Sequence, residues 1–337
     1  MKIVCNTRCL NANFTGVQRY TEEILKYFPE DIQRITPLPK YSRGVLGHAW
    51  EQIVLPLRIQ NKLLFSPSNT GPVFHKRQVV VIHDIVTIDH PEWFNSKFAG
   101  WYNKLLPALV KNVDHIVTIS DFTKERIVER LSVSENKISV VHNGVDHKFL
   151  SKSNKQIKLP FEKYVLALGS IEPRKNLNLL IDAWQKILKE VDENIGLVVA
   201  GKNGNALIFN KVSFGTNLNR VHFTGFVHED EMASLYKNAM FFCYLSSYEG
   251  FGLPPIEAMV CGCPVLVGNL TSLPEVVKNC GLQVNPFSQE DVADAILKLI
   301  KDSALREKYA ALGIVNAKRF SWEKSSKKTW DIIQQFV

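Results

Sequence analysis

The sequence predicts an α/β protein that consists of two doubly wound domains in tandem. Strand-like apolar runs alternate with helical segments along the chain, a pattern typical of parallel sheets whose strands are connected by helices. The alternation stops at the polar segment 150–160 and then starts again, which is typical of an interdomain linker. The 337 residues, of which 45% are hydrophobic and 22% charged, suffice for two globular domains of ordinary size.

In the first half, short apolar runs predict strands, and longer segments between them predict helices. The strands are expected near residues 2–8, 33–38, 63–67, 78–83, 115–119 and 138–142. The helices are expected near residues 17–28, 46–58, 97–111 and 121–131. Ligands bind at the carboxyl ends of the strands in such sheets, so polar residues that follow a strand are the first candidates for a site.

The second half repeats this alternation. Its strands are expected at residues 164–169, 195–201, 221–224, 241–245, 264–268 and 282–285. Its helices are expected from about residue 175 and near residues 229–239, 253–261, 288–301, 303–318 and 321–336.

The composition favours a cytoplasmic protein. No apolar run reaches the length of a membrane span, and the amino-terminal segment is strand-like without the apolar core of a signal peptide. The six cysteines show no zinc-binding spacing and have no histidine cluster beside them, which favours small buried thiols in a reducing compartment.

The basic excess of the chain lies in its first half. Residues 1–160 hold 22 Lys+Arg and 14 Asp+Glu, whereas residues 161–337 hold 19 of each, so the first half carries the whole net charge of +8. This half is expected to face something acidic. No nucleic-acid motif is present, so an anionic lipid surface or a phosphorylated acceptor is favoured over nucleic acid. The alternative is charge that serves only solubility.

The segment Ser246–Ala258 has the most specific pattern in the chain. Glu249 and Glu257 stand on either side of a glycine-rich turn that follows a buried strand and opens a helix. Gly250 and Gly252 allow a sharp turn and a close approach of the backbone to a ligand. Helix-start amides suit a diphosphate, and carboxylates beside them suit sugar hydroxyls, so the segment predicts a nucleotide-sugar site. The alternative is a solvated helix start, where acidic residues are common.

Arg174 and Lys175 form a second candidate, because they follow a predicted strand at the point where a helix is expected to begin. Two cations and free helix amides can clamp a diphosphate and stabilise the charge of a departing group without a metal ion. The alternative is a solvated basic pair. The sequence has neither an Asp-x-Asp motif, which would favour a metal-held diphosphate, nor a dinucleotide-binding glycine fingerprint after its first strand.

Two candidates lie in the first half. His83 follows the predicted strand 78–83, where it can face a ligand, although a lone strand-end histidine can also be structural. Gly16 follows Thr15 at the start of the first helix. It can admit a phosphate or an acceptor, or Thr15 can simply cap the helix.

The predicted helix near 97–111 carries Lys97, Lys104 and Lys111 at intervals of seven residues. This basic stripe could face an anionic membrane surface. The other face holds larger apolar side chains, which are expected to pack in the core: Phe94, Phe98, Trp101 and Leu105.

These motifs resemble the retaining family-four glycosyltransferases of the GT-B fold. The resemblance rests on Pro173–Asn176, Gly225–Val227 and the Glu249/Glu257 pair, and Asn143–Asp146 and Leu273–Glu275 extend it along the chain. The front half is most similar to the mannosyltransferase branch that builds bacterial surface polysaccharides, on the segments Thr15–Tyr20 and Ile82–Asp84.

The resemblance implies two Rossmann-like domains that face each other across a cleft. Residues 1–158, with a carboxyl-terminal helix at about 321–337, would bind the acceptor, and residues 159–320 would bind the nucleotide sugar. Arg174 and Lys175 would bind the diphosphate, Glu249 and His83 the transferred sugar, and Glu257 the ribose hydroxyls. The remaining implied contacts are backbone amides of Gly252 and Leu253 to phosphate or sugar, and Phe226 and Val227 beside the base.

The expected reaction is the transfer of a hexose with anomeric retention, with mannose from GDP-mannose as the expected substrate. No metal or cofactor is expected, and the acceptor would be a growing, lipid-linked glycan at the inner face of the membrane. Two alternatives remain open: a family-four transferase that uses a UDP-sugar, and a non-catalytic GT-B partner subunit.

Overall fold

The computed structural model describes residues 3–11, 15–146, 157–169, 172–201 and 218–337. The chain divides into two compact units. The first comprises Met1–Pro91, Ser96–Gly144 and Phe320–Val337, and the second comprises Glu92–Asn95 and Val145–Arg319. The chain therefore changes unit after Gly144, earlier than the expected boundary at 158. Most of the expected linker, residues 147–156, lies outside the described residues.

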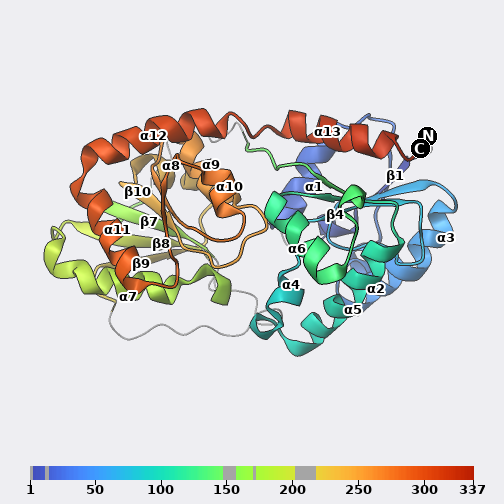
Figure 1. The fold of residues 1–337 in the computed structure, drawn as a ribbon, viewed down its shortest axis with the longest axis horizontal. Coiled ribbons are helices and arrows are strands. Elements are labelled where there is room, and N and C mark those ends of the chain that lie inside the picture. The colour runs from blue at the N-terminus through green and yellow to red at the C-terminus, as the bar shows by residue number, and fades with distance from the viewer. Residues whose placement is uncertain (1–2, 12–14, 147–156, 170–171, 202–217) are drawn as a thin grey trace. The chain divides into compact units, whose positions relative to one another are not determined.

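The first unit contains a parallel sheet in the order β2-β1-β3-β4-β5-β6 (Figure 1). Each strand lies within its expected range. The strands β1, β3, β4 and β5 are fully buried, whereas β2 at the edge of the sheet buries only Ile35. The strands are β1 (Ile3–Asn6), β2 (Gln33–Ile35), β3 (Leu63–Ser66), β4 (Gln78–Ile82), β5 (His115–Thr118) and β6 (Ile138–Val140).

Helices of the first unit connect these strands. They are α1 (Gly16–Lys26), α2 (Gly44–Ala49), α3 (Leu55–Ile59), α4 (Val86–Asp89), α5 (Ser96–Asn112), α6 (Asp121–Leu131) and α13 (Trp322–Gln334). Short 3-10 turns cover Arg8–Asn11, Pro39–Tyr41, Pro91–Trp93 and Glu135–Lys137. The expected single helix at 46–58 is instead a run of three segments, because a π-helical stretch, Trp50–Val54, joins α2 to α3. The four-residue helix α4 was not predicted, since it is too short to show a helical period.

The carboxyl-terminal helix α13 belongs to the first unit and lies along α1 (Figure 1). Ser326 Oγ donates a hydrogen bond to the carbonyl oxygen of Ile24 at 2.8 Å, and the Trp330 ring lies 5.0 Å from that of Phe28. Gly144 is in close contact with this helix, because a Cβ atom there would lie 2.1 Å from the backbone nitrogen of Trp322.

The aromatic side chains of α5 do not all enter the core as expected. Leu105 is buried, as is Phe94 just before the helix, and Phe98 is half-buried. Trp101 is 40% exposed, so the expectation is wrong for this residue. The lysines of the expected basic stripe, Lys97, Lys104 and Lys111, are exposed.

The second unit contains a parallel sheet in the order β12-β11-β10-β7-β8-β9. Its strands are β7 (Lys163–Leu168), β8 (Ile195–Ala200), β9 (Val221–Gly225), β10 (Phe241–Tyr244), β11 (Val265–Gly268) and β12 (Leu282–Val284). Its helices are α7 (Leu177–Ile187), α8 (Glu229–Asn238), α9 (Leu253–Val260), α10 (Leu273–Val277), α11 (Gln289–Lys301) and α12 (Ser303–Ala317). Short 3-10 turns cover Pro173–Lys175 and Leu188–Glu190, and α10 was not predicted.

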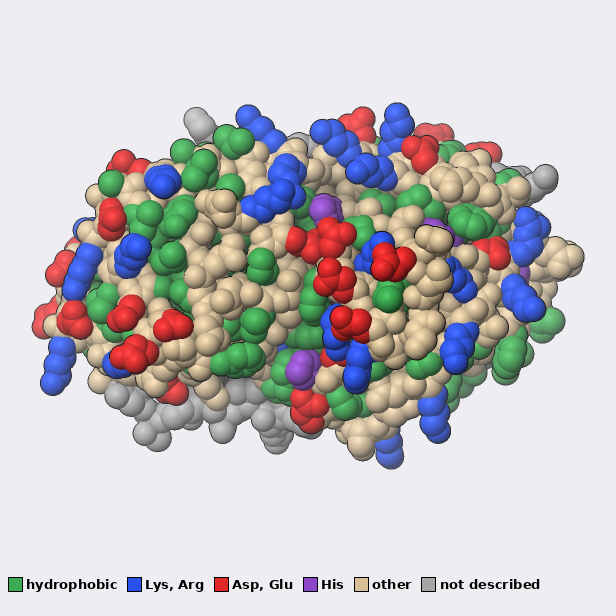
Figure 2. All heavy atoms as spheres, viewed as in Figure 1, with side chains coloured by type: hydrophobic (Ala, Val, Ile, Leu, Met, Phe, Trp, Pro, Cys, Tyr) green, Lys and Arg blue, Asp and Glu red, His purple; other side chains and the backbone are tan. Residues whose placement is uncertain are grey.

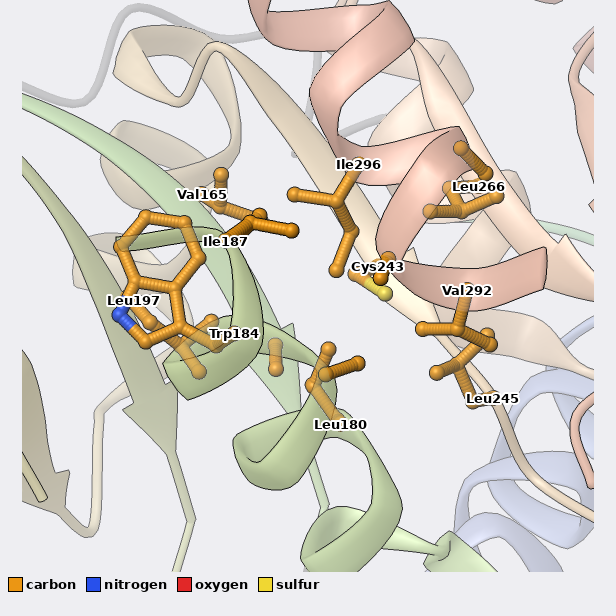
Figure 3. Close-up of a cluster of buried hydrophobic side chains, with 14 of the residues drawn as sticks. Val165, Leu180, Trp184, Ile187, Leu197, Cys243, Leu245, Leu266, Val292 and Ile296 are labelled. Carbon is orange, nitrogen blue, oxygen red and sulfur yellow. The ribbon is translucent and has the colours of Figure 1, made fainter. Parts of the chain in front are cut away.

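The core of the second unit lies between its sheet and the helices α7 and α11 (Figure 3). Trp184 of α7 is fully buried and faces strand residues such as Leu197, while Ile296 of α11 lies near Cys243 of β10. This packing holds the strands in place, and the predicted site residues come directly after the carboxyl ends of these strands.

The six cysteines are free, and four of them are buried. Within the described parts of the chain, no helix combines the length and the apolarity that crossing a bilayer would require.

Candidate active site

The strongest site motifs come together at adjacent strands of the second unit. Strands β7 and β10 pair in parallel, so their carboxyl ends lie side by side at one edge of the sheet. The turn Pro173–Lys175 follows β7, and the segment from Ser246 to α9 follows β10. The helix expected from about Lys175 begins at Leu177 instead. Asn176, with φ at 55°, separates it from the turn that carries Arg174 and Lys175.

The carboxylate of Glu249 is the centre of this cluster. Its Oε1 accepts hydrogen bonds from Lys175 Nζ at 2.6 Å, Ser246 Oγ at 2.6 Å, Tyr244 OH at 2.8 Å and Arg174 Nη1 at 3.1 Å. Burial alone would raise the pKa of Glu249. The charges of Lys175 and Arg174, with hydrogen bonds from Lys175 and Ser246, outweigh burial and lower it to about 2. Glu249 is therefore a fixed anion at neutral pH and cannot supply a proton.

Lys175 is the more deeply buried of the two cations. Its side chain is 9% exposed, compared with 23% for Arg174. Burial lowers the pKa of Lys175, the neighbouring Arg174 lowers it further, and Glu249 opposes both. The side chain reaches the cluster along Gly169, where a Cβ atom would lie 3.0 Å from Lys175 Cγ. The ammonium group also lies 4.9 Å above the ring of Tyr244.

Arg174 links the turn after β7 to the segment after β10 through both its side chain and its backbone. Its Nε donates to Glu172 Oε2 at 2.9 Å, in addition to the bond to Glu249. Its carbonyl oxygen accepts from the backbone nitrogen of Ser247 at 2.8 Å and lies 3.0 Å from Ser246 Oγ. These bonds fix the turn that carries both cations against the segment that carries Glu249.

The start of α9 depends on a backbone conformation that favours glycine. Gly252 has φ at 101°, and a Cβ atom there would lie 2.7 Å from Leu273 Cδ2. Ser272 Oγ lies 2.9 Å from the carbonyl oxygen of Glu249 and 2.8 Å from that of Phe251, so its one O–H can donate to either and hold the turn before the helix. The helix then begins at Leu253, so the amides predicted to contact phosphate or sugar are at its amino terminus.

Glu257 lies within α9 and is 7% exposed. Its Oε2 accepts a hydrogen bond from Tyr236 OH of α8 at 3.4 Å. Burial and the charge of Glu257 raise the pKa of Tyr236, so the phenol keeps its proton and can donate it to this bond. The carboxylate is thus oriented by a neighbouring helix, as a residue that binds ribose hydroxyls would need to be.

Phe226 and Val227, the residues predicted to line the base, follow β9 at the carboxyl edge of the sheet. Gly225 has φ at 70°, and Phe226 is exposed with its ring 4.9 Å from that of His228. An exposed aromatic ring at a strand end suits contact with a nucleobase.

His83 lies at the carboxyl end of β4 in the first unit and is 5% exposed. Its Nε2 lies 2.8 Å from the carbonyl oxygen of Pro67, and because a carbonyl only accepts, Nε2 carries the proton. Burial lowers the pKa of His83 to about 4, against the effect of this hydrogen bond. The ring is therefore neutral at physiological pH, and Nδ1 is its acceptor atom.

Gly16 begins α1, and Thr15 is its N-cap residue. The backbone nitrogen of Thr15 donates to Gln18 Oε1 at 2.9 Å, so the capping interpretation describes this turn. A Cβ atom at Gly16 would meet nothing within 4 Å, so the space over this turn is open and the proposed contact with a ligand stays a prediction.

Sequence reasoning missed a buried polar cluster at the carboxyl end of β1. Glu51, which is fully buried on the π-helical segment, accepts hydrogen bonds from Asn6 Nδ2 at 2.8 Å and Arg8 Nε at 3.1 Å. Arg8 Nη2 also donates to Thr70 Oγ1 at 3.0 Å. The sequence did contain a signal for this cluster, because Glu51 is the one acidic residue between residues 32 and 83 and therefore stands out among basic and apolar neighbours.

Comparison with known proteins relates the whole chain to sugar-transferring enzymes. Residues 151–314 match the family model described as "Glycosyl transferases group 1", and residues 65–149 match the one described as "Glycosyltransferase Family 4". O-antigen chain mannosyltransferase B of Escherichia coli is 32% identical over 98% of this chain and 98% of its own. O-antigen chain mannosyltransferase RfbU of Salmonella typhimurium is 31% identical over 78% of this chain and 71% of its own.

Solved structures confirm the GT-B fold that the sequence predicted. The crystal structure of WaaG, a glycosyltransferase involved in lipopolysaccharide biosynthesis, has a TM-score of 0.72 at 17% identity and covers 98% of this chain and 99% of its own. The crystal structure of Anabaena HepE in complex with UDP has a TM-score of 0.74 at 16% identity and covers 99% of this chain and 100% of its own.

Proposed function

Because the chain belongs to the glycosyltransferases of group 1 and family 4, as its identity to a mannosyltransferase over nearly its full length shows, we propose that it transfers mannose from GDP-mannose. The acceptor in this proposal is a growing, lipid-linked O-antigen glycan at the cytoplasmic face of the membrane. Two relatives that are named O-antigen mannosyltransferases support the choice of sugar and pathway.

The observation that carries the proposal is the carboxylate of Glu249 held by two cations at the carboxyl ends of β7 and β10. Lys175 Nζ has three N–H groups, of which Tyr244 and Glu249 occupy two, so a third can donate to a diphosphate oxygen. Charge on the diphosphate increases as the glycosidic bond breaks. Cations that are already fixed in position stabilise this charge without reorganising.

The reaction proceeds with retention on one face of the sugar. The bond from the anomeric carbon to the phosphate oxygen breaks as the bond to the acceptor oxygen forms, and the proton of the attacking hydroxyl moves to the departing phosphate. Glu249 is a poor covalent nucleophile, because four hydrogen bonds end on its Oε1 and its pKa is about 2. Its Oε2 receives none of these four bonds and can accept one from a sugar hydroxyl.

The first unit supplies the acceptor side in this proposal. His83 is neutral with Nδ1 as an acceptor, so it holds a sugar hydroxyl rather than transferring a proton. Metal independence belongs to the same proposal, since Arg174 and Lys175 take the electrostatic role that a divalent cation would have.

The proposal is tested in two steps. A thermal-shift screen against GDP, UDP and ADP should give the largest rise in melting temperature with GDP, since a bound nucleotide stabilises the fold by mass action. Transfer from radiolabelled GDP-mannose to a mannose-terminated glycan on a lipid diphosphate should then proceed in excess EDTA. If UDP alone stabilises the protein, the donor is a UDP-sugar and not GDP-mannose. Absence of both transfer and donor hydrolysis would support the non-catalytic partner subunit, and a strict need for Mg²⁺ or Mn²⁺ would refute the cationic clamp.

A further inference from the structure

An apolar stripe is exposed on the helical stretch 44–59, which comprises α2, the π-helical segment and α3. Leu46, Ile53 and Leu57 recur at intervals of seven and four residues, which places them along one side of a helix. On the opposite side, Trp50, Leu55 and Ile59 are buried in a cluster against the sheet. The exposed stripe is therefore not the core-facing side of this helix.

Two further apolar side chains extend the stripe. Phe74 lies in a loop that is fastened to the helix, because Gln52 Nε2 donates to the carbonyl oxygen of Gly71 at 2.8 Å and Gln52 Oε1 accepts from the backbone nitrogen of Val73 at 2.9 Å. Trp101 of α5 packs 5.0 Å from the ring of His48 of α2, and Figure 1 shows α2 and α5 next to each other.

We refer to these side chains together as the α2–α3 surface: Val45, Leu46, Ile53, Leu57, Phe74 and Trp101. Val45, Leu46, Ile53, Leu57 and Phe74 are between 56% and 90% exposed. An exposed apolar surface of this kind on one side of a domain marks an interaction site.

The chain segment that carries most of the α2–α3 surface has exposed charge of one sign. Residues 32–83 contain seven Lys+Arg and one acidic residue, Glu51, which is fully buried and paired with Arg8. Arg34 is exposed and donates to the carbonyl oxygen of Leu25 at 3.2 Å. The other exposed cations of this segment are Lys40, Arg43, Arg58, Lys76 and Arg77. No carboxylate among the described residues pairs with any of these five. At the lower right of Figure 2, blue basic and green hydrophobic side chains are interleaved with little red.

We propose that the α2–α3 surface docks on an anionic lipid bilayer. Its apolar side chains would enter the boundary between headgroups and acyl chains, while the surrounding cations contact lipid phosphates. The charge pattern favours this occupant over a second copy of the chain. A symmetric dimer through this surface would bring two sets of cations together without carboxylates between them.

This inference goes beyond the proposed reaction, because it assigns a surface that neither the sugar donor nor the glycan has to touch. Its test needs neither substrate, so docking and mannosyl transfer can fail separately.

The test is co-sedimentation of the full chain with vesicles made of equal parts phosphatidylcholine and phosphatidylglycerol. The wild-type protein should pellet with them at low salt and be released at high salt, because salt screens the attraction between cations and phosphates. Ile53→Gln/Leu57→Gln should lower the partition coefficient about tenfold or more, since two aliphatic side chains lose their burial in lipid. Arg43→Glu/Arg58→Glu should lower it comparably and reduce its dependence on salt.

The matched control is Ile314→Gln/Val315→Gln, which replaces two exposed apolar side chains of α12 in the second unit and should leave vesicle binding unchanged. Melting temperatures and circular dichroism show whether each variant is folded, and the charge-reversal pair provides a second route if the glutamine pair does not fold. Three outcomes would overturn the inference: wild-type protein that ignores these vesicles at low salt, unchanged binding by both surface variants, or a wild-type dimer that the surface variants dissociate without any change in vesicle binding.

Discussion

Lys175 Nζ lies 2.6 Å from Glu249 Oε1, although 74 residues separate these two side chains in the sequence. The contact joins the turn after β7 to the segment after β10, so each of the two best sequence motifs depends on the other for its geometry. Both side chains are nearly buried, and a buried charge that loses its partner is costly. Removal of either side chain alone is therefore expected to destabilise the second unit.

The first prediction concerns acid stability. The pKa of Glu249 is about 2 in the folded protein, compared with 4.5 for a glutamate that makes no contacts, as in the unfolded chain. The folded state therefore binds this proton less readily than the unfolded chain. The stabilisation from this group is complete above pH 4.5 and is lost as the pH falls toward 2. Urea unfolding of wild type and Glu249→Gln should show that the difference in unfolding free energy shrinks over this window. A difference that does not change with pH would refute the assignment.

The second prediction concerns turnover. Arg174→Ala and Lys175→Ala should each lower kcat by about two orders of magnitude or more, because each removes a preorganised charge from the departing diphosphate. Lys186→Ala, at an exposed lysine on α7 that pairs with Glu290, should leave kcat unchanged. Melting temperatures distinguish lost chemistry from lost folding, since Lys175→Ala also leaves Glu249 with one cation fewer. Near-normal kcat in both folded variants would rule out the clamp.

The third prediction concerns the nucleotide. If Glu257 binds the ribose hydroxyls, Glu257→Ala should raise the dissociation constant of GDP about tenfold or more, the effect of losing a charge-assisted hydrogen bond. The 2′-deoxy analogue should bind more weakly than GDP to the wild type, but it should lose little further affinity in Glu257→Ala. Glu290→Ala, at an exposed glutamate of α11, is the control, and calorimetric titration measures all of these. Equal losses for both nucleotides would place Glu257 away from the ribose.

The fourth prediction concerns His83. Because its pKa is about 4, its ring should not titrate between pH 5 and 8 in heteronuclear NMR spectra. The unfolded chain binds a proton near pH 6.5 and the folded chain does not, so His83 destabilises the fold as the pH falls from 6.5 toward 4. His83→Phe should remove this part of the pH dependence. A His83 resonance that titrates near 6.5 would contradict the buried, neutral ring.

The central strands were predictable from sequence, because strands such as β4, β8 and β10 are short apolar runs that are fully buried in a parallel sheet. The edge strands β2, β9 and β12 are only partly buried, and their positions followed from the alternation of strands and helices. The glycine-rich turn before α9 was also predictable, since only glycine suits the φ of Gly252. The short helices α4 and α10 were not, because four or five residues show no helical period.

The limits of the sequence are clearest for side chains that meet only in the fold. Arg174, Lys175 and Glu249 were each identified as site residues, but nothing in their spacing indicated that they form one ion-pair cluster, nor that Tyr244 and Ser246 complete it. Similarly, residues 46–58 were predicted as one helix, without any indication of which of its apolar residues face the core. A pattern of hydrophobic positions does not distinguish Leu55, which is buried, from Leu57, which is exposed.

The π-helical segment has one more consequence, which follows from Glu51. This residue holds the inner side of the helical stretch 44–59 to Asn6 and Arg8 at the end of β1, while Ile53, two residues on, points outward. A helix with its side chains is about 10 Å thick. If its outer side rests on lipid, the helix becomes a spacer that sets the height of the β1 end above the headgroups.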